Sequence, residues 1–492
     1  MKCDLVPHSE TQHICQICNR TITHGGHPPE KCHRECRGPN AVRRVATFAR
    51  AATKHIANGM QLVPEAEKAR RLSICESNVC GKYKAGRCQR CTCSLQIKAG
   101  WALEQCPDTP SQWGPWRAER KPGPLRVAFL TPSLGQGGAE RWIVDLCRYM
   151  PACDIDVRSA WLIDGGQSWQ PVVDELVSLG VNVYGGPNLM PGRPNAVSGI
   201  TRIGPHLASL TAALQDVDIA ITWGLPNLTD LLRGSQFAGR VIVVSHGEAD
   251  ATKELLAASI AGATDFAAVS EQARLAFPTQ TQPRCGVLWN GCNTDRLQII
   301  QGRAVQRSLW GLADDEIAIG YLGRLHHQKR PLTAVHAAAA CGDKFRPVLI
   351  GEGLHQTEII REARRLAGDR LIAPGAISPI GDALAALDVW VLGSPAEGFS
   401  IALLEAWAAG VPVVSTRVGC LNEIEQQFGA MVTEISVDAS EVELRSAIHH
   451  ALSPSGRSIA NRARQVALEH LTAELSAQRW AEWLREICPV AV

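Results

Sequence analysis

The stretch SPAEGFSIALLEAWAAGVPVVST, residues 394–416, contains the structural unit from which most of this chain is built. It follows an apolar run, passes through a loop, continues as a helix and ends in a second apolar run. The loop presents Gly398, Phe399 and Ser400 just before the helix, where backbone N–H groups have no partner within the helix. Because such N–H groups and the helix dipole favour an anion, we expect this loop to bind a phosphate.

Two carboxylates accompany this loop. Glu397 lies within the loop, and Glu405 lies about two turns into the helix. Carboxylates at these two positions can accept hydrogen bonds from hydroxyl groups of a ligand held at the loop. Taken alone, the two glutamates also fit an ordinary strand–loop–helix unit with two surface acids, so both interpretations stay open at this point.

Short apolar runs alternate with helical segments on both sides of this unit, from residue 125 onward. The first series of predicted strands is LRVAFLT, DVRSAWLI, VDIAIT, RVIVVSH and DFAAVS, and the second is EIAIGYLG, RPVLIG, LIAPG, DVWVLG and VPVVST. Alternating strands and helices predict parallel sheets with right-handed crossovers. We therefore predict an α/β protein with two Rossmann-like domains, residues 125–300 and 301–471, and a ligand cleft between them at the carboxyl ends of the strands.

The remaining segments complete this division of the chain. Residues 1–120 are rich in Cys, His and Arg and have few periodic apolar runs. The stretch RKPGP, residues 120–124, reads as a linker because Pro and Gly interrupt regular structure. The last helical stretch lies within residues 472–492, and we expect it to pack near the junction of the two Rossmann-like domains.

A basic segment, YLGRLHHQKRP, follows the first strand of the second series. It places Arg324 and Lys329 just beyond Gly323, where that strand is expected to end. Cations at the carboxyl end of a strand can neutralise a diphosphate, arginine through its planar fork and lysine as a point charge. A solvated basic turn is an equal alternative for this segment alone.

A glycine-rich segment, TPSLGQGGAERW, lies between the first strand and the first helix. Gly137 and Gly138 allow the backbone to approach a phosphate closely. The segment lacks both the spacing of the dinucleotide-binding fingerprint and the GK[ST] of a P-loop. Taken alone, this segment is therefore only weak evidence for phosphate binding.

The order of these motifs is more specific than any one of them. GGAER, then GR with a lysine five residues after the arginine, then E-x7-E before AGVPVV, resembles the family 4 glycosyltransferases of the GT-B fold. The resemblance covers about residues 125–487 of the chain. VVSHGE supports it, with His246 at a strand end where that family often has a sugar-contacting histidine, and LWNGCNTDRL supports it with Asn290 retained.

The sequence departs from the family pattern at two points. Asn293 stands at the usual acidic position of the NGVD-type segment, and Cys420 stands where a second glycine is common, although Glu423 follows as expected. These departures bear on the identity of the sugar more than on the class of enzyme.

The resemblance implies transfer of a sugar from a UDP- or GDP-sugar, with retention at the anomeric carbon, to an acceptor that is a glycan, lipid, protein or nucleic acid. Arg324, Lys329 and the helix end would neutralise the departing diphosphate, and Glu397 and His246 would contact the donor sugar. The donor-binding residues that it implies are Gly137, Gly138, Asn290, Gly398, Phe399, Ser400 and Glu405. The acceptor would lie mainly against the first Rossmann-like domain.

No catalytic metal is expected for this chemistry. The sequence contains Asp-x-Asp at Asp154/Asp156 and at Asp216/Asp218. Both pairs directly precede predicted strands, so we interpret them as chance matches and not as a metal-binding motif. The alternative to an active enzyme is a zinc-dependent nucleic-acid- or protein-binding module fused to a degenerate transferase fold. A phosphorylase or a sugar epimerase of the same fold is a third hypothesis.

The first 120 residues hold most of the thiols, since 11 of the 18 cysteines lie at or before Cys106. Four of these cysteines form a C-x2-C-x13-C-x3-C pattern, and this pattern matches tetrahedral Zn²⁺ binding. A second set contains six cysteines, which is more than one tetrahedral site needs. Two of these cysteines are then unliganded, or two metal ions share thiolates, or an iron–sulfur cluster forms. The predicted ligands of these structural sites are Cys15, Cys18, Cys32 and Cys36, and Cys75, Cys80, Cys88, Cys91, Cys93 and Cys106.

Charge and hydropathy limit the partners and the cellular location that the chain can have. Residues 1–124 carry 20 Lys and Arg against 10 Asp and Glu, a net charge of +10, whereas the rest of the chain carries −8. This asymmetry predicts an anionic partner for the basic region, although a simple basic module is an equal alternative. No apolar run reaches the roughly 18 residues of a membrane span. Because no export signal stands at the start, we expect a cytoplasmic location.

Overall fold

The computed structural model describes residues 5–9, 12–15, 21–23, most of 63–101, and 123–488 with gaps at 136, 164–167, 185–209, 226–236 and scattered positions between 211 and 280. The chain divides into two compact units, residues 1–119 and 120–492. Each unit is described by itself below.

The first unit contains small elements. Strands β1 (Leu5–Ser9), β2 (Gln12–Cys15) and β3 (Thr21–Thr23) form an antiparallel sheet, and the two-residue strands β4 (Tyr83–Lys84) and β5 (Arg87–Cys88) pair between helices α2 (Glu65–Glu76) and α3 (Leu95–Lys98). Arg71 of α2 is fully buried, and its guanidinium donates to the carbonyls of Ala99 and Trp101 at 3.3 and 3.0 Å. A buried arginine bound to carbonyls ties α2 to the end of α3.

The metal prediction falls mostly outside the described residues. Cys18, Cys32, Cys36, Cys80, Cys91, Cys93 and Cys106 lie outside them, and only the backbone of Cys15 is described. Among the described side chains, Cys75 is half-buried and Cys88 is buried, and no group of three or more His, Cys, Asp or Glu is placed there to hold a metal ion. The zinc site and the anionic partner therefore stay predictions.

The second unit begins with a parallel sheet of seven strands in the order β12-β11-β10-β9-β6-β7-β8. We call this half of the unit the N-lobe. Its strands are β6 (Leu125–Thr131), β7 (Ile155–Leu162), β8 (Asn182–Tyr184), β9 (Ile219–Thr222), β10 (Arg240–Ser245), β11 (Asp265–Ala268) and β12 (Cys285–Val287). Its helices include α4 (Gly138–Tyr149), the 3₁₀ helix η1 (Met150–Cys153), α5 (Gln170–Ser178), α9 (Glu271–Arg274) and η4 (Gln282–Arg284). The central strands are buried almost completely, as expected for a sheet covered on both faces.

The second half, which we call the C-lobe, contains a parallel sheet of six strands in the order β15-β14-β13-β16-β17-β18. Its strands are β13 (Ile317–Leu322), β14 (Phe345–Ile350), β15 (Ile372–Gly375), β16 (Val389–Leu392), β17 (Val413–Thr416) and β18 (Thr433–Ile435). Its helices are η5 (Thr294–Leu297), α10 (Arg303–Leu309), η6 (His327–Lys329), α11 (Leu332–Cys341), α12 (Gln356–Ala367), η7 (Gly368–Arg370), α13 (Gly381–Ala386), α14 (Ile401–Ala409), α15 (Leu421–Phe428), α16 (Glu441–Leu452) and α17 (Pro454–His470).

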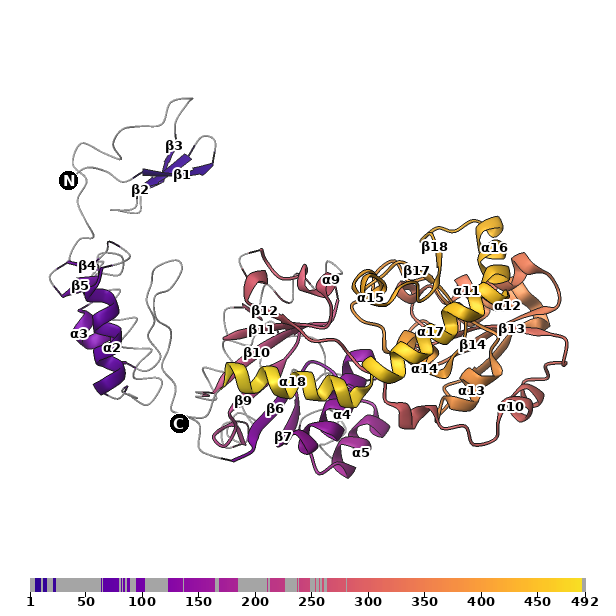
Figure 1. Ribbon diagram of the computed structural model, residues 1–492, viewed down its shortest axis with the longest axis horizontal. Helices are drawn as coiled ribbons and strands as arrows, with labels where there is room; N and C mark the ends of the chain where they lie inside the picture. Colours follow the sequence, from indigo (N-terminus) through magenta and orange to yellow (C-terminus); the bar gives the residue numbers. More distant parts are fainter. Residues whose placement is uncertain are drawn as a thin grey trace. The chain divides into compact units, whose positions relative to one another are not determined.

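The chain crosses between the lobes twice, at one place. Cys292 and Thr472 form a bridge there, with Cys292 N–H donating to Leu471 O and Ala473 N–H donating to Cys292 O, both at 2.8 Å. After this crossing, α18 (Ala473–Ile487) runs back along the N-lobe and packs against α4 and η1 (Figure 1). The ring of Trp480 lies 5.3 Å from that of Trp142 in α4, so the last helix belongs to the N-lobe core.

The structure confirms the two parallel sheets and all ten strands that the sequence predicts. The strands β8, β12 and β18 were not predicted. Each has three residues and lies at the edge of its sheet, and the first two contain no buried residue. A short strand at an exposed edge has no apolar run or clear alternation, which is the pattern that reveals a strand in a sequence.

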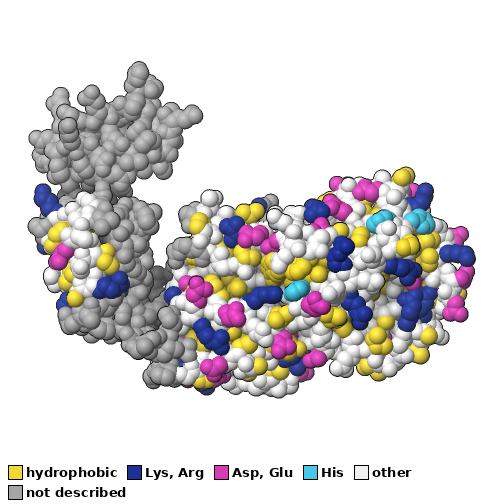
Figure 2. All heavy atoms as spheres, viewed as in Figure 1, with side chains coloured by type: hydrophobic (Ala, Val, Ile, Leu, Met, Phe, Trp, Pro, Cys, Tyr) yellow, Lys and Arg dark blue, Asp and Glu magenta, His cyan; other side chains and the backbone are white. Residues whose placement is uncertain are grey.

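The surface of the second unit carries both signs of charge. Figure 2 shows lysine and arginine side chains interspersed with aspartate and glutamate over the face in view. Exposed pairs such as Arg417 with Glu434, at 2.7 Å, are typical of this surface. Among the described residues no helix has both the length and the apolar character that a membrane span requires.

Candidate active site

A cavity of about 490 Å³ lies between the two lobes. Its lining comes from segments that directly follow β6 and β10 of the N-lobe and β13, β14 and β16 of the C-lobe. The carboxyl ends of both sheets therefore open onto one space, as the sequence predicts for a pair of Rossmann-like domains. A cavity of this size is large enough for a small organic ligand.

Arg324 is a cation directly available to a ligand in this cavity. It follows β13 after Gly323, and its side chain is exposed and lines the cavity. Its carbonyl accepts from the Tyr321 hydroxyl at 3.0 Å, but its guanidinium makes no hydrogen bond or ion pair with any residue that the structure describes. A guanidinium held at a strand end without an internal partner is free to bind an anion through its planar fork.

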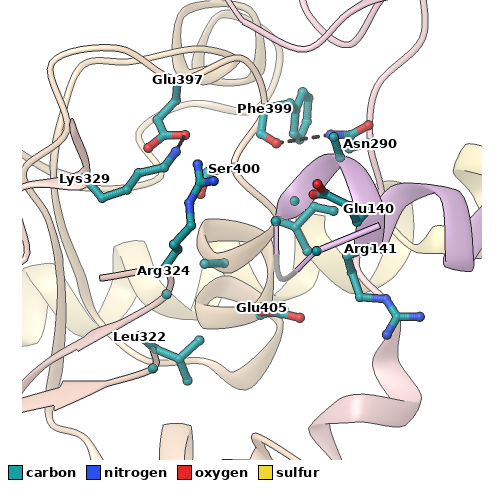
Figure 3. A pocket seen from close by; sticks show the side chains of 18 of the residues that line it. Glu140, Arg141, Asn290, Leu322, Arg324, Lys329, Glu397, Phe399, Ser400 and Glu405 are labelled. Carbon is teal, nitrogen blue, oxygen red and sulfur yellow. Dashed lines mark hydrogen bonds and ion pairs between the residues drawn. The ribbon is translucent and has the colours of Figure 1, made fainter. Parts of the chain in front are cut away.

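Lys329 and Glu397 form an ion pair across the C-lobe part of the cavity. The Lys329 Nζ lies 2.5 Å from Glu397 Oε2 (Figure 3). Glu397 is only 8% exposed, and its second carboxylate oxygen has no partner within the described structure. A buried oxygen without a partner is costly, so this carboxylate is poised to accept a hydrogen bond from a bound ligand.

The loop before α14 contains the helix cap and packs closely against the N-lobe. Ser400 caps α14, with its hydroxyl accepting from Leu403 N at 3.4 Å. The carbonyl of Gly398 accepts from Ser270 Oγ at 2.9 Å, and the carbonyl of Phe399 accepts from Asn290 Nδ2 at 3.1 Å. Both donors belong to the N-lobe, so the phosphate-binding loop predicted from the sequence is also a contact between the lobes.

Asn290 lines the cavity, but its amide group is engaged within the protein. Its Nδ2 donates to the 397–400 loop, while its Oδ1 is buried without a partner in the described structure. The side chain is 3% exposed. Its amide thus positions the loop, and its oxygen is the atom left to accept a further hydrogen bond.

Glu405 lies below this loop on α14 and is paired with a residue that the sequence analysis missed. Its carboxylate forms an ion pair with Arg296 of η5, and both residues line the cavity. Burial raises the pKa of Glu405, while the guanidiniums of Arg296 and Arg141 partly offset this rise. Arg296 lies in the LWNGCNTDRL segment, but only the folded chain brings it to Glu405.

His246 follows β10, as predicted, and lines the cavity from the N-lobe side. Its ring contacts the edges of Trp142 and Trp223, with centroid distances of 4.7 and 5.5 Å. Burial among these rings lowers the pKa of His246 to about 3, so the imidazole is neutral at physiological pH. Its Nε2 has no partner in the described structure and can bind a ligand hydroxyl.

The glycine-rich segment forms the N-lobe wall. Gly135, Gly137 and Gly138 line the cavity together with Glu140 of the first turn of α4. Ser133 Oγ donates a short hydrogen bond to Glu140. Glu140 of the GGAER motif, Trp169 and Trp223 line this wall although none of them was predicted as a site residue.

The two Asp-x-Asp pairs do not line the cavity, and three of their four aspartates form ion pairs with arginines. Arg126 pairs with Asp216 and, at 3.0 Å, with Asp218, while Asp156 pairs with Arg158 at 2.8 Å. None of these residues lines the cavity. The paired aspartates lie near the amino-terminal ends of β6, β7 and β9, at the opposite end of these strands from the cavity.

Residues 316–453 match the family Glycosyl transferases group 1. The match covers most of the C-lobe, including Arg324, Lys329, Glu397 and Glu405. It supports the sequence resemblance for the lobe that holds these four side chains.

Three curated proteins are similar to longer stretches. The lipopolysaccharide core biosynthesis mannosyltransferase LpsB of Rhizobium meliloti is 31% identical over 147 residues, 28% of this chain and 42% of its own. The putative glycosyltransferase EpsF of Bacillus subtilis is 26% identical over 340 residues, 63% of this chain and 84% of its own. The N-acetyl-alpha-D-glucosaminyl L-malate synthase of Bacillus anthracis is 26% identical over 228 residues, 46% of this chain and 53% of its own. The chain thus spans about half the length of two of these relatives.

Solved structures share the arrangement of both lobes. Anabaena HepE in complex with UDP and glucose matches with a TM-score of 0.61 at 18% identity, over 74% of this chain and 100% of that chain. The sucrose-phosphate synthase of Thermosynechococcus elongatus matches with a TM-score of 0.56 at 17% identity, over 75% and 100%. At this level of identity the matches show the two-lobed GT-B fold and nothing about activity.

Proposed function

We propose that residues 120–492 form a glycosyltransferase that transfers a sugar from a UDP- or GDP-sugar to an acceptor, with retention at the anomeric carbon. The observation that carries this proposal is the shared cavity: Arg324, the Lys329–Glu397 pair and the N-terminal end of α14 all face one space between two Rossmann-like lobes. The similarity of residues 316–453 to the group 1 glycosyl transferases supports it. HepE, whose fold is alike, is complexed with UDP and glucose.

The chemical problem in such a transfer is the negative charge on the departing diphosphate. The Arg324 guanidinium has no partner in the described structure and supplies a full positive charge. The charge of Lys329 is partly neutralised by its ion pair with Glu397, and the N-terminal end of α14 adds a partial positive charge. Removing one such preorganised partner typically costs on the order of 3 kcal/mol of transition-state stabilisation.

The other side chains hold the donor in place. The free Oε1 of Glu397 accepts a hydroxyl of the donor sugar beside the leaving oxygen, and the neutral His246 contacts the same sugar from the N-lobe. Glu405 binds the ribose once the nucleotide has separated it from Arg296. Because the lobes already touch at Gly398, the bound sugar is shielded from water, which limits hydrolysis of the donor.

The test begins with nucleotide binding. Calorimetric titration of the full-length protein with UDP, GDP and ADP is expected to show micromolar binding of UDP or GDP. Donor turnover is then measured with UDP- and GDP-sugars for the wild type and for Glu397→Gln. We expect the variant to bind the nucleotide within a few-fold of the wild type while turnover falls on the order of 10²- to 10³-fold.

The matched control is Glu362→Gln, the same change on an exposed part of α12 that does not line the cavity. It should leave both binding and turnover unchanged. Failure of all three nucleotides to bind would sink the proposal. Such a result would favour the degenerate fold, which the present combination of Arg324, Lys329, Glu397 and Glu405 in one cavity argues against.

A further inference from the structure

Arg296 loses its ion-pair partner when a nucleotide occupies the proposed donor site. In this structure Arg296 pairs with Glu405, and both side chains line the cavity. Once ribose hydroxyls donate to the Glu405 carboxylate in its place, the guanidinium needs another acceptor. An arginine that is half-buried and without an acceptor is unfavourable, so a second carboxylate close by would stabilise the bound state.

Asp145 of α4 offers such an acceptor. It is 4% exposed, and its two carboxylate oxygens differ in their contacts. Oδ1 accepts from Asn293 Nδ2 at 3.2 Å and lies 3.3 Å from Arg141 Nε. Oδ2 is buried and has no partner in the described structure. Because a buried carboxylate oxygen without a donor is costly, this atom is a ready site for a further N–H group.

The segment that carries Arg296 already contacts α4 at Asp145. Asn293 caps η5, with its Oδ1 accepting from Asp295 N at 3.0 Å and from the Tyr149 hydroxyl at 3.2 Å. The same side chain donates to Asp145 through its Nδ2. Arg296 therefore lies one turn of η5 away from a residue in direct contact with Asp145. Among the described side chains Arg296 and Asp145 form no ion pair with each other, so the second position is open.

The groups around Asp145 determine which of them titrate near neutral pH. The titratable and charged groups that face it are Arg141, Cys147 and Tyr149 of α4, Cys292 at the crossing between the lobes, Arg296 of η5 and Glu405 of α14. Burial raises the pKa of both thiols and of the Tyr149 phenol above their ordinary values, so these three do not titrate near pH 6. Burial also raises the pKa of Asp145 to about 6, and the charges of Arg141 and Arg296 partly offset this rise. At pH 6 Asp145 therefore holds a proton in about half of the molecules.

We propose that Arg296 is a positioning residue with two alternative partners, Glu405 in the free protein and Asp145 when the donor ribose occupies Glu405. In the free protein Arg296 keeps the buried Glu405 carboxylate charged and therefore able to accept hydroxyl groups. In the bound protein its guanidinium donates to Asp145 Oδ2. The positive charge is then compensated in both states.

This inference rests on the proposed function, because the ribose is the group that releases Arg296. Glu405 belongs to the C-lobe and Asp145 to the N-lobe, and Figure 3 shows Arg141 of the same N-lobe helix in the region of Glu405. The exchange adds an ion pair between η5 and α4 only when the nucleotide is bound. A cation beside Asp145 favours its charged form, so the exchange also releases the proton of this acid. Donor binding is thus coupled to a contact between the lobes and to the release of a proton.

The test measures the protons released on binding. Calorimetric titrations of the full-length protein with UDP-glucose and with GDP-mannose are run at pH 6 and at pH 8, each in two buffers of different ionisation enthalpy. The diphosphate of these probes is esterified at both ends, so the probes themselves do not titrate between these pH values. At pH 6 we expect the wild type to release about half a proton per bound ligand more than Asp145→Asn, and at pH 8 we expect no difference.

The affinities of single and double variants assign the exchange to these residues. At pH 8 Asp145→Asn should weaken nucleotide-sugar binding on the order of tenfold, because asparagine cannot compensate the charge of Arg296. In an Arg296→Gln background the same change should weaken binding less than about twofold, because the partner is already absent. Arg296→Lys, which keeps a cation, should retain most of the dependence on Asp145.

The matched control is Asp216→Asn, the same change at an N-lobe aspartate that pairs with Arg126 and does not line the cavity. It should change neither the affinity nor the proton release. The melting temperature of every variant is measured as well, because a purely structural role of Asp145 would lower Tm and leave the proton release as in the wild type.

The outcomes separate the two proposals. If Asp145→Asn released as many protons at pH 6 as the wild type, or weakened binding equally with and without Arg296, the exchange would be refuted while the transferase proposal stood. If none of UDP, GDP and the two nucleotide-sugars bound, both proposals would fail together.

Discussion

Replacing Gly398 by alanine tests whether the close contact between the lobes is needed for turnover. A Cβ atom at this position would lie 2.0 Å from His246 O, 2.5 Å from His246 C and 3.0 Å from Gly247 N. All three are backbone atoms, so no side chain can rotate out of the way. The only relief is a movement of the 397–400 loop relative to the end of β10.

The size of that movement follows from the contact distance. Ordinary van der Waals contact begins near 3.4 Å, so the loop must retreat by about 1.4 Å from His246 O. This retreat would stretch the cross-lobe hydrogen bonds from Ser270 Oγ to Gly398 O and from Asn290 Nδ2 to Phe399 O, now 2.9 and 3.1 Å. A misplacement of about 1 Å costs on the order of 10²-fold in rate, equivalent to about 2.7 kcal/mol in the activation free energy.

We therefore expect Gly398→Ala to lower kcat/KM for donor turnover on the order of 10²-fold. Nucleotide affinity should fall less than tenfold, because Arg324 and Lys329 belong to the same lobe as the displaced loop. Steady-state turnover of the nucleotide-sugar identified by screening, and calorimetric titration with its nucleotide, measure the two quantities.

The matched control is Gly456→Ala in the first turn of α17. A Cβ there would lie 2.2 Å from His450 O, a similar overlap with backbone, but within the C-lobe and away from the cavity lining. This variant should lower Tm while the folded protein keeps its turnover. If Gly398→Ala retained more than half of the wild-type kcat/KM, the inference that the lobes must touch at Gly398 would be refuted.

Three further predictions concern the charged groups. Arg324→Ala should weaken UDP or GDP binding about tenfold to 100-fold while nucleoside binding stays unchanged, since the arginine is assigned to the diphosphate; titration calorimetry checks this, and an equal loss for the nucleoside would contradict it. Asn293→Asp places a second carboxylate where Asn293 Nδ2 now donates to Asp145 Oδ1 at 3.2 Å. Because burial raises the pKa of Asp145 to about 6, this carboxyl is ionised at pH 8 in the wild-type protein, so the variant must bury a second like charge beside it or take up a proton, and we expect a loss of about 3 kcal/mol in the free energy of unfolding at this pH. The loss should be smaller at pH 5, where one proton is retained; equal losses in urea unfolding at the two pH values would count against this. Burial raises the pKa of Glu423 to about 7, although its carboxylate accepts from Glu271 N across the lobes. The native protein therefore holds this proton more tightly than the unfolded chain, so the stabilisation is complete below the ordinary carboxyl pKa and is lost as the pH rises through about 7. Glu423→Gln should flatten this fall in Tm between pH 5 and 8, and an unchanged slope would exclude Glu423 as its source.

The order of motifs along the chain predicted much of the C-lobe site, because the residues involved are local to their elements. Arg324 and Lys329 follow a buried strand by a few residues, and Glu397 and Glu405 bracket one loop and helix. Such short-range placement is set by the strand–loop–helix geometry itself, so the sequence was enough to bring these four side chains to the carboxyl edge of one sheet.

The two parallel sheets, the sheet edge at which the cavity lies and the cations that line it could all be inferred from the sequence, because apolar periodicity and strand ends are local properties. Which side chains form ion pairs and which remain without a partner became visible only in the folded chain. The contacts of Arg296 with Glu405, of Gly398 with the backbone of His246, and of Trp169 with Leu134 join elements that are distant in sequence or belong to different lobes. They depend on the packing of one lobe or layer against another, and no pattern within a single segment contains that information.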